Sequence, residues 1–415
     1  MLINSLILFL SSFASFLATF WIYFKLLRIA REKNMVDNPD ARKLQKKPVP
    51  VIGGLAVFFG IVAAVLLSSC LMDCTHLVPV LMAMTVLLFL GWIDDMIGLS
   101  PNQRFLIEIL VILMMIFGGG GAIDSLHGIW GIGTFSWWIA VPLTVFIGVG
   151  IINAINLVDG VNGLSSGLCI VCSLLFAHAF FIGGDIPNAM LCCAMAGGLF
   201  PFLLHNLIGK YSRMFIGDSG TMSMGALMAW CVIQMGRHDT PAIWLEDQGI
   251  NVLALSMAIL SVPVFDTVRV MVMRMVQGKS PFNPDRTHLH HMLFDYGRSH
   301  ALTSATEVVI DLLVCVVLFV TYRFGGGMDA QIYAVIIASL IMICGLYFFL
   351  HRNYRLNTRI AFRLRKLMAS MRQDDKSWWI RLQMWLDTPR KNAPYIREEY
   401  WEELKSAPER RRLRK

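Results

Sequence analysis

From Trp137 to Ile182 the chain reads WWIAVPLTVFIGVGIINAINLVDGVNGLSSGLCIVCSLLFAHAFFI. Two apolar runs, residues 137–155 and 164–182, enclose a polar stretch that contains Asn156, Asp159 and Asn162. Each run has about the length of an α-helix that crosses a bilayer, roughly 20 residues. Polar groups at a membrane boundary are costly and usually serve a function. The segment therefore predicts two membrane helices joined by a functional turn.

Apolar runs of this kind recur along the whole chain. Of the 415 residues, 56% are hydrophobic and 15% are charged, a composition that excludes an ordinary soluble domain. The predicted spans cover residues 6–27, 51–71, 77–93, 105–120, 137–155, 164–182, 188–207, 221–235, 252–273, 303–322 and 330–350. We therefore predict an all-α polytopic membrane protein with about eleven transmembrane helices.

Lysine and arginine residues are distributed unequally between the predicted loops. Arg28, Arg31 and Lys33 begin a basic loop after the first span, and most later basic residues fall on the same side if the spans alternate. The opposite side holds little besides Arg237 and Arg323. Because cytoplasmic loops carry the excess of basic residues, this pattern predicts an N-terminus outside and a C-terminus in the cytoplasm.

The character of the sequence changes near residue 352. We expect a transmembrane catalytic domain over residues 1–351 and a basic cytoplasmic tail over 352–415. Between Arg355 and Lys366, bases alternate with aliphatic residues, as in an amphipathic helix that lies on anionic lipid. Alternatively, the tail only fixes topology by its charge. The net charge of +8 is a membrane-surface signal, and with no nucleic-acid-binding module in the sequence we expect no nucleic-acid partner.

The polar clusters all fall on the predicted cytoplasmic side. Asp94 and Asp95 end the third span, and residues 153–163, 210–221 and 274–303 join later pairs of spans. Polar residues with only structural roles would be scattered over both sides of the membrane. This convergence predicts an active site at the cytoplasmic surface of the membrane.

The acids and amides of these clusters suit a hard metal ion. The candidate oxygen ligands are Asp94, Asp95, Asp159, Asp218, Asn153 and Asn156. A set without thiolate favours Mg²⁺ or Mn²⁺, which usually also bind substrate phosphates. Because adjacent helical residues point in different directions, we expect one of Asp94 and Asp95 to act and the other to orient. As alternatives, the pair ends a helix, Asp218 caps one, and the asparagines bond to neighbouring helices.

Residues 278–291 concentrate histidines beside basic residues. His288, His290 and His291 lie close to Lys279 and Arg286, a combination that suits a diphosphate. A zinc site is the competing interpretation, but no cysteine or acid nearby shows a recognised zinc spacing.

Taken together, the blocks resemble the polyprenyl-phosphate N-acetylhexosamine-1-phosphate transferases of glycosyltransferase family 4. The resemblance rests on Asp94-Asp95, the segment from Asn156 to Leu164, residues 215–220 and the block from Asp285 to His291, with residues 48–54 in support. The spaced His-x-His-His pattern is similar to bacterial undecaprenyl-phosphate GlcNAc-1-phosphate transferases. The phospho-MurNAc-pentapeptide translocases carry three consecutive histidines instead. Gln45 departs from the pattern, because many relatives have His there.

The resemblance implies transfer of a sugar 1-phosphate from a UDP-sugar to undecaprenyl phosphate, with release of UMP. This is the first membrane step of a cell-surface glycan pathway, such as lipopolysaccharide or O-antigen synthesis, in the bacterial cytoplasmic (inner) membrane. The implied catalytic residues are Asp94, Asp95, Asp159, His290 and His291. Implied substrate-binding residues are Lys46, Lys47, Asn153, Asn156, Asn162, Phe215, Arg286 and His288. Asp218 and Asn156 are the implied Mg²⁺ ligands.

The resemblance also implies the binding partners of the protein. The partners are the UDP-sugar, undecaprenyl phosphate and the bilayer, with a homodimer left open. The alternatives are a phospho-MurNAc-pentapeptide translocase-like enzyme and a proton-coupled transporter, whose acids would lie near the midplane of the membrane. A covalent aspartyl intermediate is a less favoured mechanism.

Overall fold

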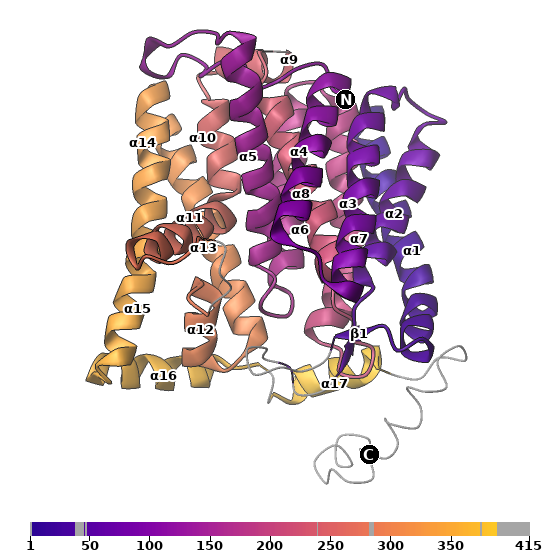
Figure 1. Ribbon diagram of the computed structural model, residues 1–415, viewed down its shortest axis with the longest axis vertical. Coiled ribbons are helices and arrows are strands. Elements are labelled where there is room, and N and C mark those ends of the chain that lie inside the picture. Colours follow the sequence, from indigo (N-terminus) through magenta and orange to yellow (C-terminus); the bar gives the residue numbers. More distant parts are fainter. Residues whose placement is uncertain are drawn as a thin grey trace.

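The computed structural model describes residues 2–37, 45, 48–238, 240–281, 286–373 and 376–387. Most helices run along one common axis and form a bundle (Figure 1). The first half contains α1 (Leu2–Glu32), α2 (Gly53–Ser68), η1 (Thr75–Leu77), α3 (Val78–Ile97), α4 (Pro101–Gly118), η2 (Ile129–Gly131), α5 (Trp137–Leu157), α6 (Leu164–Ile182) and α7 (Ile186–Leu207). The second half contains α8 (Gly217–Met235), α9 (Thr240–Asp247), α10 (Val252–Ile259), α11 (Ser261–Val276), α12 (Leu289–Gly297), α13 (His300–Arg323), α14 (Met328–Ser339), η3 (Leu340–Gly345), α15 (Leu346–Arg355), α16 (Arg359–Met371) and α17 (Ser377–Leu386).

The protein is an all-α, multi-pass membrane protein, as its composition predicted. Among the described residues, eight helices are long and apolar enough to cross a membrane, or nine if the bent pair α10–α11 counts as one span. Large apolar side chains such as Phe9 (65% exposed) and Phe146 (78% exposed) cover the outer surface, where lipid replaces water. The predicted number of eleven spans is not supported, because α2 has only 16 residues and α8 is too polar at its start.

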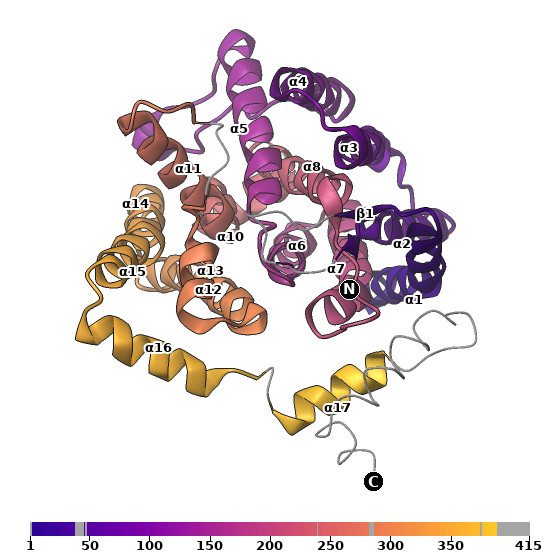
Figure 2. The ribbon, with the colours of Figure 1, turned by 60° about the horizontal axis from the view of Figure 1, so that its bottom comes forward.

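Helix α8 is the central element of the bundle. It packs against α2, α3 and α5 (Figure 2). Every residue from Ser219 to Met235 is buried. Small residues permit this close packing: a Cβ added to Gly225 would lie 2.8 Å from the Cα atom of Ile152 in α5. Because protein and not lipid surrounds α8, its sequence does not need the hydropathy of a peripheral span. Its first turn faces the lower end of the bundle in Figure 1.

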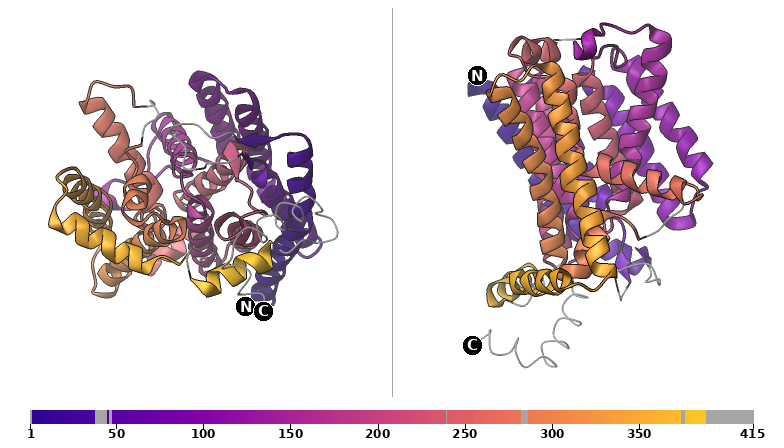
Figure 3. Two further views of the ribbon diagram at one scale, coloured as in Figure 1. Left: turned by 90° about the horizontal axis from the view of Figure 1, so that it is seen from below. Right: turned by 90° about the vertical axis from the view of Figure 1, so that its left-hand side faces the viewer.

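The predicted span over residues 252–273 is wrong as a single straight helix. The chain forms α10 and α11 instead, bent by 77°, and α11 crosses the bundle axis (Figures 1 and 3). Pro263 lies in the first turn of α11, where the missing N–H of proline is tolerated. The buried Asp311 carboxylate accepts hydrogen bonds from Ser261 Oγ (2.8 Å) and Val262 N–H (3.1 Å). These bonds satisfy backbone and side-chain groups that the break would otherwise leave buried and unpaired.

Two short strands bring the segment before α2 to the same end of the bundle. Strand β1 (Val36–Asp37) pairs antiparallel with β2 (Val49–Pro50). Phe215, just before α8, donates its N–H to the Pro50 carbonyl (2.7 Å) and accepts from Gly53 N–H (2.9 Å). The chain around residue 50 is thereby fixed against the start of α8.

Helices α16 and α17 lie across this end of the bundle, nearly perpendicular to the other helices (Figures 1 and 2). Trp379 of α17 is buried in a small cluster with Ile208, whereas Trp378 and Trp385 are exposed. Asp387, 1% exposed, accepts hydrogen bonds from the backbone N–H groups of Lys210 (3.0 Å), Tyr211 (3.2 Å) and Ser212 (3.0 Å). Protein contacts therefore hold α17 against the loop between α7 and α8. The predicted tail beyond residue 387 lies outside the described residues.

Candidate active site

A cavity of about 350 Å³ opens at the end of the bundle where α3 and α5 end and α8 begins. Its walls are formed by Asp37, Gln45, Val51, Asp95, Asn156, Asp159, Gly160, Val161, Asn162, Asn206, Phe215, Ile216, Gly217, Asp218 and His300. Six of the residues predicted as site residues thus share one cavity: Asp95, Asn156, Asp159, Asn162, Phe215 and Asp218. Segments more than 100 residues apart in the chain converge here, as the one-sided distribution of polar clusters predicted.

The neighbouring carboxylates at the end of α3 have different partners. Asp94 pairs with Arg104 of α4 (2.7 Å) and accepts a hydrogen bond from Leu99 N–H (2.6 Å), so it closes the turn after α3. Asp95 accepts hydrogen bonds from the backbone N–H groups of Asp218 (3.1 Å) and Ser219 (3.3 Å). Asp95 therefore occupies the positive end of the α8 dipole. The capping role considered for Asp218 falls to Asp95, which leaves the Asp218 side chain directed to the cavity.

Asp218 belongs to a polar network that crosses three helices. Asn156 Nδ2 donates to Asp218 Oδ1 (2.8 Å) and to Thr221 Oγ1 (2.8 Å). Arg104 donates to Asn156 Oδ1 (3.3 Å), and its guanidinium lies 3.7 Å from Asp218 Oδ2. Asn153 lies one turn further from the cavity, where it donates to the buried Glu108 (2.5 Å). Asn156 thus contacts the proposed metal-binding acid directly, whereas Asn153 supports the helix behind it.

The turn between α5 and α6 holds Asp159 at the cavity wall. Ser165 Oγ donates to Asp159 Oδ1 (2.6 Å). Surrounding protein atoms desolvate the carboxylate and raise the pKa of Asp159 to about 6, with repulsion from Asp218 also raising it. Asn206 fixes the turn: its Oδ1 accepts from Gly163 N–H (2.7 Å), and its Nδ2 donates to the Met214 carbonyl (2.8 Å). Asn206 therefore couples this turn to the loop that presents Phe215.

The three predicted histidines lie beside the cavity, not in its wall. His288 Nδ1 lies 2.8 Å from Asp266 Oδ2, and the same carboxylate pairs with Arg269 (2.6 Å). Burial lowers the pKa of His290 well below 6.5, and repulsion from His291 and His288 lowers it further. The ring of His290 packs against Gly160, which itself lines the cavity. His290 is therefore a neutral group behind the cavity wall. His291 packs beside it, with ring centroids 4.3 Å apart.

Several residues of this site were not predicted from the sequence. Arg104 lies just before the predicted span over residues 105–120. Its contacts with Asp94 and Asp218 become visible only in the folded structure. Asn206 and His300 come from the ends of α7 and α13. A signal for the role of α4 was Glu108 of the same helix. An ionisable residue inside a predicted span usually indicates a functional site. Of the remaining predicted residues, Arg286 is exposed, and Lys46 and Lys47 lie outside the described residues.

The donor set of the cavity fits a hard divalent cation. Its walls offer the carboxylates of Asp95, Asp159 and Asp218 and the amide oxygens of Asn156 and Asn162, with no thiol among the described lining residues. The Asp218 side chain keeps 37% of its surface exposed, so its carboxylate is accessible from the cavity. Oxygen-only sites of this kind match Mg²⁺ and Mn²⁺.

The fold and the site define a class of protein: a multi-pass membrane protein with an acid-lined cavity at one end of its helix bundle. Residues 77–236 match the family model of glycosyl transferase family 4. A Bacillus subtilis (strain 168) protein named probable undecaprenyl-phosphate N-acetylglucosaminyl 1-phosphate transferase is 31% identical over 280 residues, covering 66% of this chain and 74% of the relative. The Salmonella typhi undecaprenyl-phosphate alpha-N-acetylglucosaminyl 1-phosphate transferase is 30% identical, covering 79% of this chain and 85% of the relative. The chain belongs to glycosyl transferase family 4, as its sequence blocks predicted.

Proposed function

We propose that this protein transfers N-acetylglucosamine 1-phosphate from UDP-N-acetylglucosamine to undecaprenyl phosphate and releases UMP. The observation that carries the proposal is the network of Asp218, Asn156 and Arg104 at the wall of the cavity. It supplies an open carboxylate beside a cation, which suits a reaction between phosphates. The names of the family relatives support the acceptor and the sugar.

In the proposed reaction, an oxygen of undecaprenyl phosphate attacks the β-phosphorus of the UDP-sugar. A new P–O bond forms, the bond to the bridging oxygen of UMP breaks, and UMP leaves with the electron pair. Two anionic phosphates must meet, so their repulsion has to be screened. Asp218 and Asn156 would hold Mg²⁺, which supplies charge neutralisation of the diphosphate when bound. Arg104 contributes a fixed positive charge next to them.

The carboxylates divide the remaining tasks by their contacts. Asp94 pairs with Arg104 and positions it, whereas Asp95 fixes the start of α8 and faces the cavity. We assign the positioning of the acceptor phosphate to Asp95. Asp159 is a second positioning carboxylate in the wall of the same cavity. Phe215 is half-buried at the cavity wall, not on the lipid-facing surface, so its ring is available to stack on uracil, with Asn162 near the base edge.

A transporter is less well supported by this geometry. Substrate sites of secondary transporters lie near the bilayer midplane. The acids of this cavity lie where α3 and α5 end and α8 begins. With the basic loops on the same side, we place this end of the bundle in the cytoplasm of a bacterium, at the inner membrane.

The test is UMP release by the purified full-length protein in detergent, with UDP-N-acetylglucosamine, undecaprenyl phosphate and Mg²⁺. Asp218→Asn should lose nearly all turnover. Asp73→Asn, which changes an exposed acid in the turn between α2 and η1, is the matched control and should keep it. A parallel assay with UDP-MurNAc-pentapeptide as donor distinguishes the proposed enzyme from a phospho-MurNAc-pentapeptide translocase. No UMP release with either donor would overturn the proposal.

A further inference from the structure

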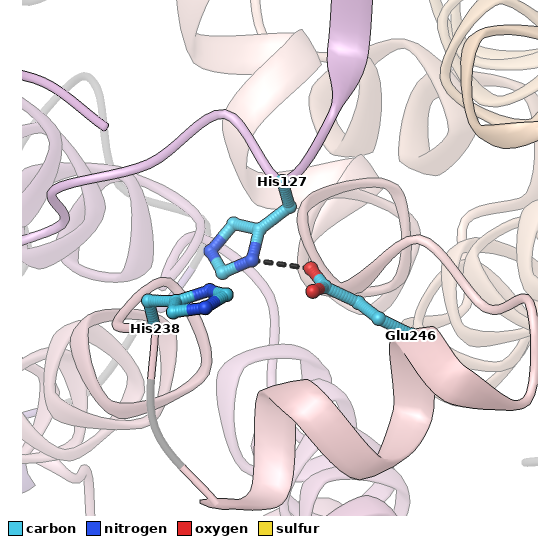
Figure 4. Close-up of side chains that lie close together, drawn as sticks. All are labelled: His127, His238 and Glu246. Atoms are coloured by element: carbon cyan, nitrogen blue, oxygen red, sulfur yellow. Dashed lines mark ion pairs between the residues drawn. The ribbon is translucent and has the colours of Figure 1, made fainter. Parts of the chain in front are cut away.

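Three metal-binding side chains meet at the end of the bundle opposite the candidate active site. His127 comes from the loop between α4 and α5, His238 follows α8, and Glu246 belongs to α9. One ligand atom from each lies within 4.8 Å of the others (Figure 4). The proposed function uses none of these residues.

The hydrogen bonds of His127 leave one ring nitrogen facing a carboxylate. Its Nε2 lies 3.1 Å from the Gly236 carbonyl oxygen, which can only accept, so Nε2 carries the hydrogen. In a neutral imidazole, Nδ1 then presents its lone pair. Nδ1 points at Glu246 Oε1, and the His127 side chain is fully buried (Figure 4). A lone pair and a carboxylate in contact need a cation between them, either a proton or a metal ion.

The backbone around His127 holds the ring in this orientation. His127 has a φ of 53°, in the left-handed region that non-glycine residues rarely adopt, and its N–H donates to Ser125 Oγ (2.9 Å). Such conformations are strained and cluster at functional sites. A histidine whose Nε2–H is bound to a backbone carbonyl, with Nδ1 free to ligate, is also the usual arrangement around protein-bound metals.

We propose that His127, His238 and Glu246 bind a divalent ion of the zinc type. Two imidazoles and one carboxylate form a known zinc ligand set, with the fourth position open to water. Ligand atoms around tetrahedral zinc are about 3.3 Å apart, so the three groups close on an ion with side-chain movements of about 1 Å. His238 is exposed and free to make that movement.

The chemistry of the ligands separates this site from the candidate active site. Imidazole nitrogen favours Zn²⁺ and related transition ions, whereas Mg²⁺ prefers oxygen. The three side chains line a cavity of about 410 Å³ together with Gly128, Gly131 and Gly133. Because His238 lies three residues beyond the end of α8, whose other end carries Asp218, a bound ion would tie the far end of the central helix to the loop before α5 and to α9.

The test uses the full-length protein without a histidine tag, stripped with a chelator and titrated with Zn²⁺ by calorimetry. We expect one equivalent to bind, and a rise in unfolding temperature with Zn²⁺ but not with Mg²⁺. His238→Gln and Glu246→Gln should each weaken binding by roughly 10-fold or more, because each removes a ligand. Both positions are at least partly exposed, unlike the buried His127, so folding should survive both substitutions.

His76→Gln is the matched control, since His76 is an exposed histidine at the same end of the bundle. It should leave Zn²⁺ binding unchanged. Titration with Co²⁺ should give the visible absorption of a four-coordinate nitrogen and oxygen site without a thiolate charge-transfer band. Absence of stoichiometric Zn²⁺ binding, binding that persists in both ligand variants, or loss of binding in His76→Gln would overturn the proposal.

Discussion

Gly217 offers a sharp test of the proposed active site, because its substitution displaces one carboxylate. It has a φ of 72°, and a Cβ added there would lie 2.6 Å from Asp95 Oδ2. Ordinary contacts begin at 3.4 Å, so Asp95 has to retreat by about 0.8 Å. The left-handed backbone costs an alanine roughly 1–2 kcal/mol. A displacement near 1 Å at a reacting centre costs about 100-fold in rate.

The control is Gly325→Ala, where φ is 77° and nothing lies within 4 Å of the added Cβ. Both variants carry the same backbone strain, so thermal unfolding should show a similar loss, larger in Gly217→Ala by about 1 kcal/mol for weakened hydrogen bonds to Asp95. UMP release should fall about 100-fold in Gly217→Ala alone. Equal turnover in the two glycine variants would refute the placement of Asp95 in the reaction.

Four further predictions follow from the contacts of individual acids. Chelation of divalent ions should abolish turnover and Mg²⁺ or Mn²⁺ should restore it, whereas Asp218→Asn should not be rescued; full turnover after chelation would exclude the metal. Asp94→Asn and Asp95→Asn should differ in turnover, because Asp94 is paired with Arg104 and Asp95 faces the cavity; identical loss with intact nucleotide binding would indicate joint action on one ligand. The pKa of Asp159 near 6 means that its carboxyl is protonated below that pH, so turnover should rise from pH 5 to 7, and Asp159→Asn should flatten the profile. Asp387→Ala should lower the unfolding free energy by roughly 1–3 kcal/mol, because three backbone N–H groups, two of them buried, lose their acceptor, and an unchanged unfolding temperature would contradict that role.

The parts of the site that were predicted from the sequence share one property: they are polar residues set against apolar runs. Asn156, Asp159 and Asp218 stand out because a membrane boundary makes polar groups costly. Arg104 and Asn206 do not stand out, since each lies at the end of a helix, where a polar residue is ordinary. Their roles depend on which helix ends meet, and that is decided by packing around α8.

The fold, like the site, was predictable from the sequence only in part. Hydropathy identifies helices that face lipid, and it predicted α1, α5 and α6 well. It also predicted most of α8, over residues 221–235, but it missed the polar first turn of that helix, which is surrounded by protein. It missed the break between α10 and α11 as well, where Asp311 accepts hydrogen bonds from the start of α11. The charged residues Asp266 and Arg269 inside the predicted span 252–273 were the signal that this segment does not cross straight through lipid.

The bond between Asp387 and the loop at residues 210–212 has a consequence for biogenesis. The acceptor follows its donors by 175 to 177 residues, so the loop next to Phe215 gains these hydrogen bonds only when almost the whole chain has been made. At synthesis rates of about 5–20 residues per second, this delay is roughly 10 to 35 s. During that interval the growing chain already contains Asp95, Asn156 and Asp218 but holds an unfinished loop beside them. The C-terminal segment thus completes the loop beside the cavity only late in synthesis.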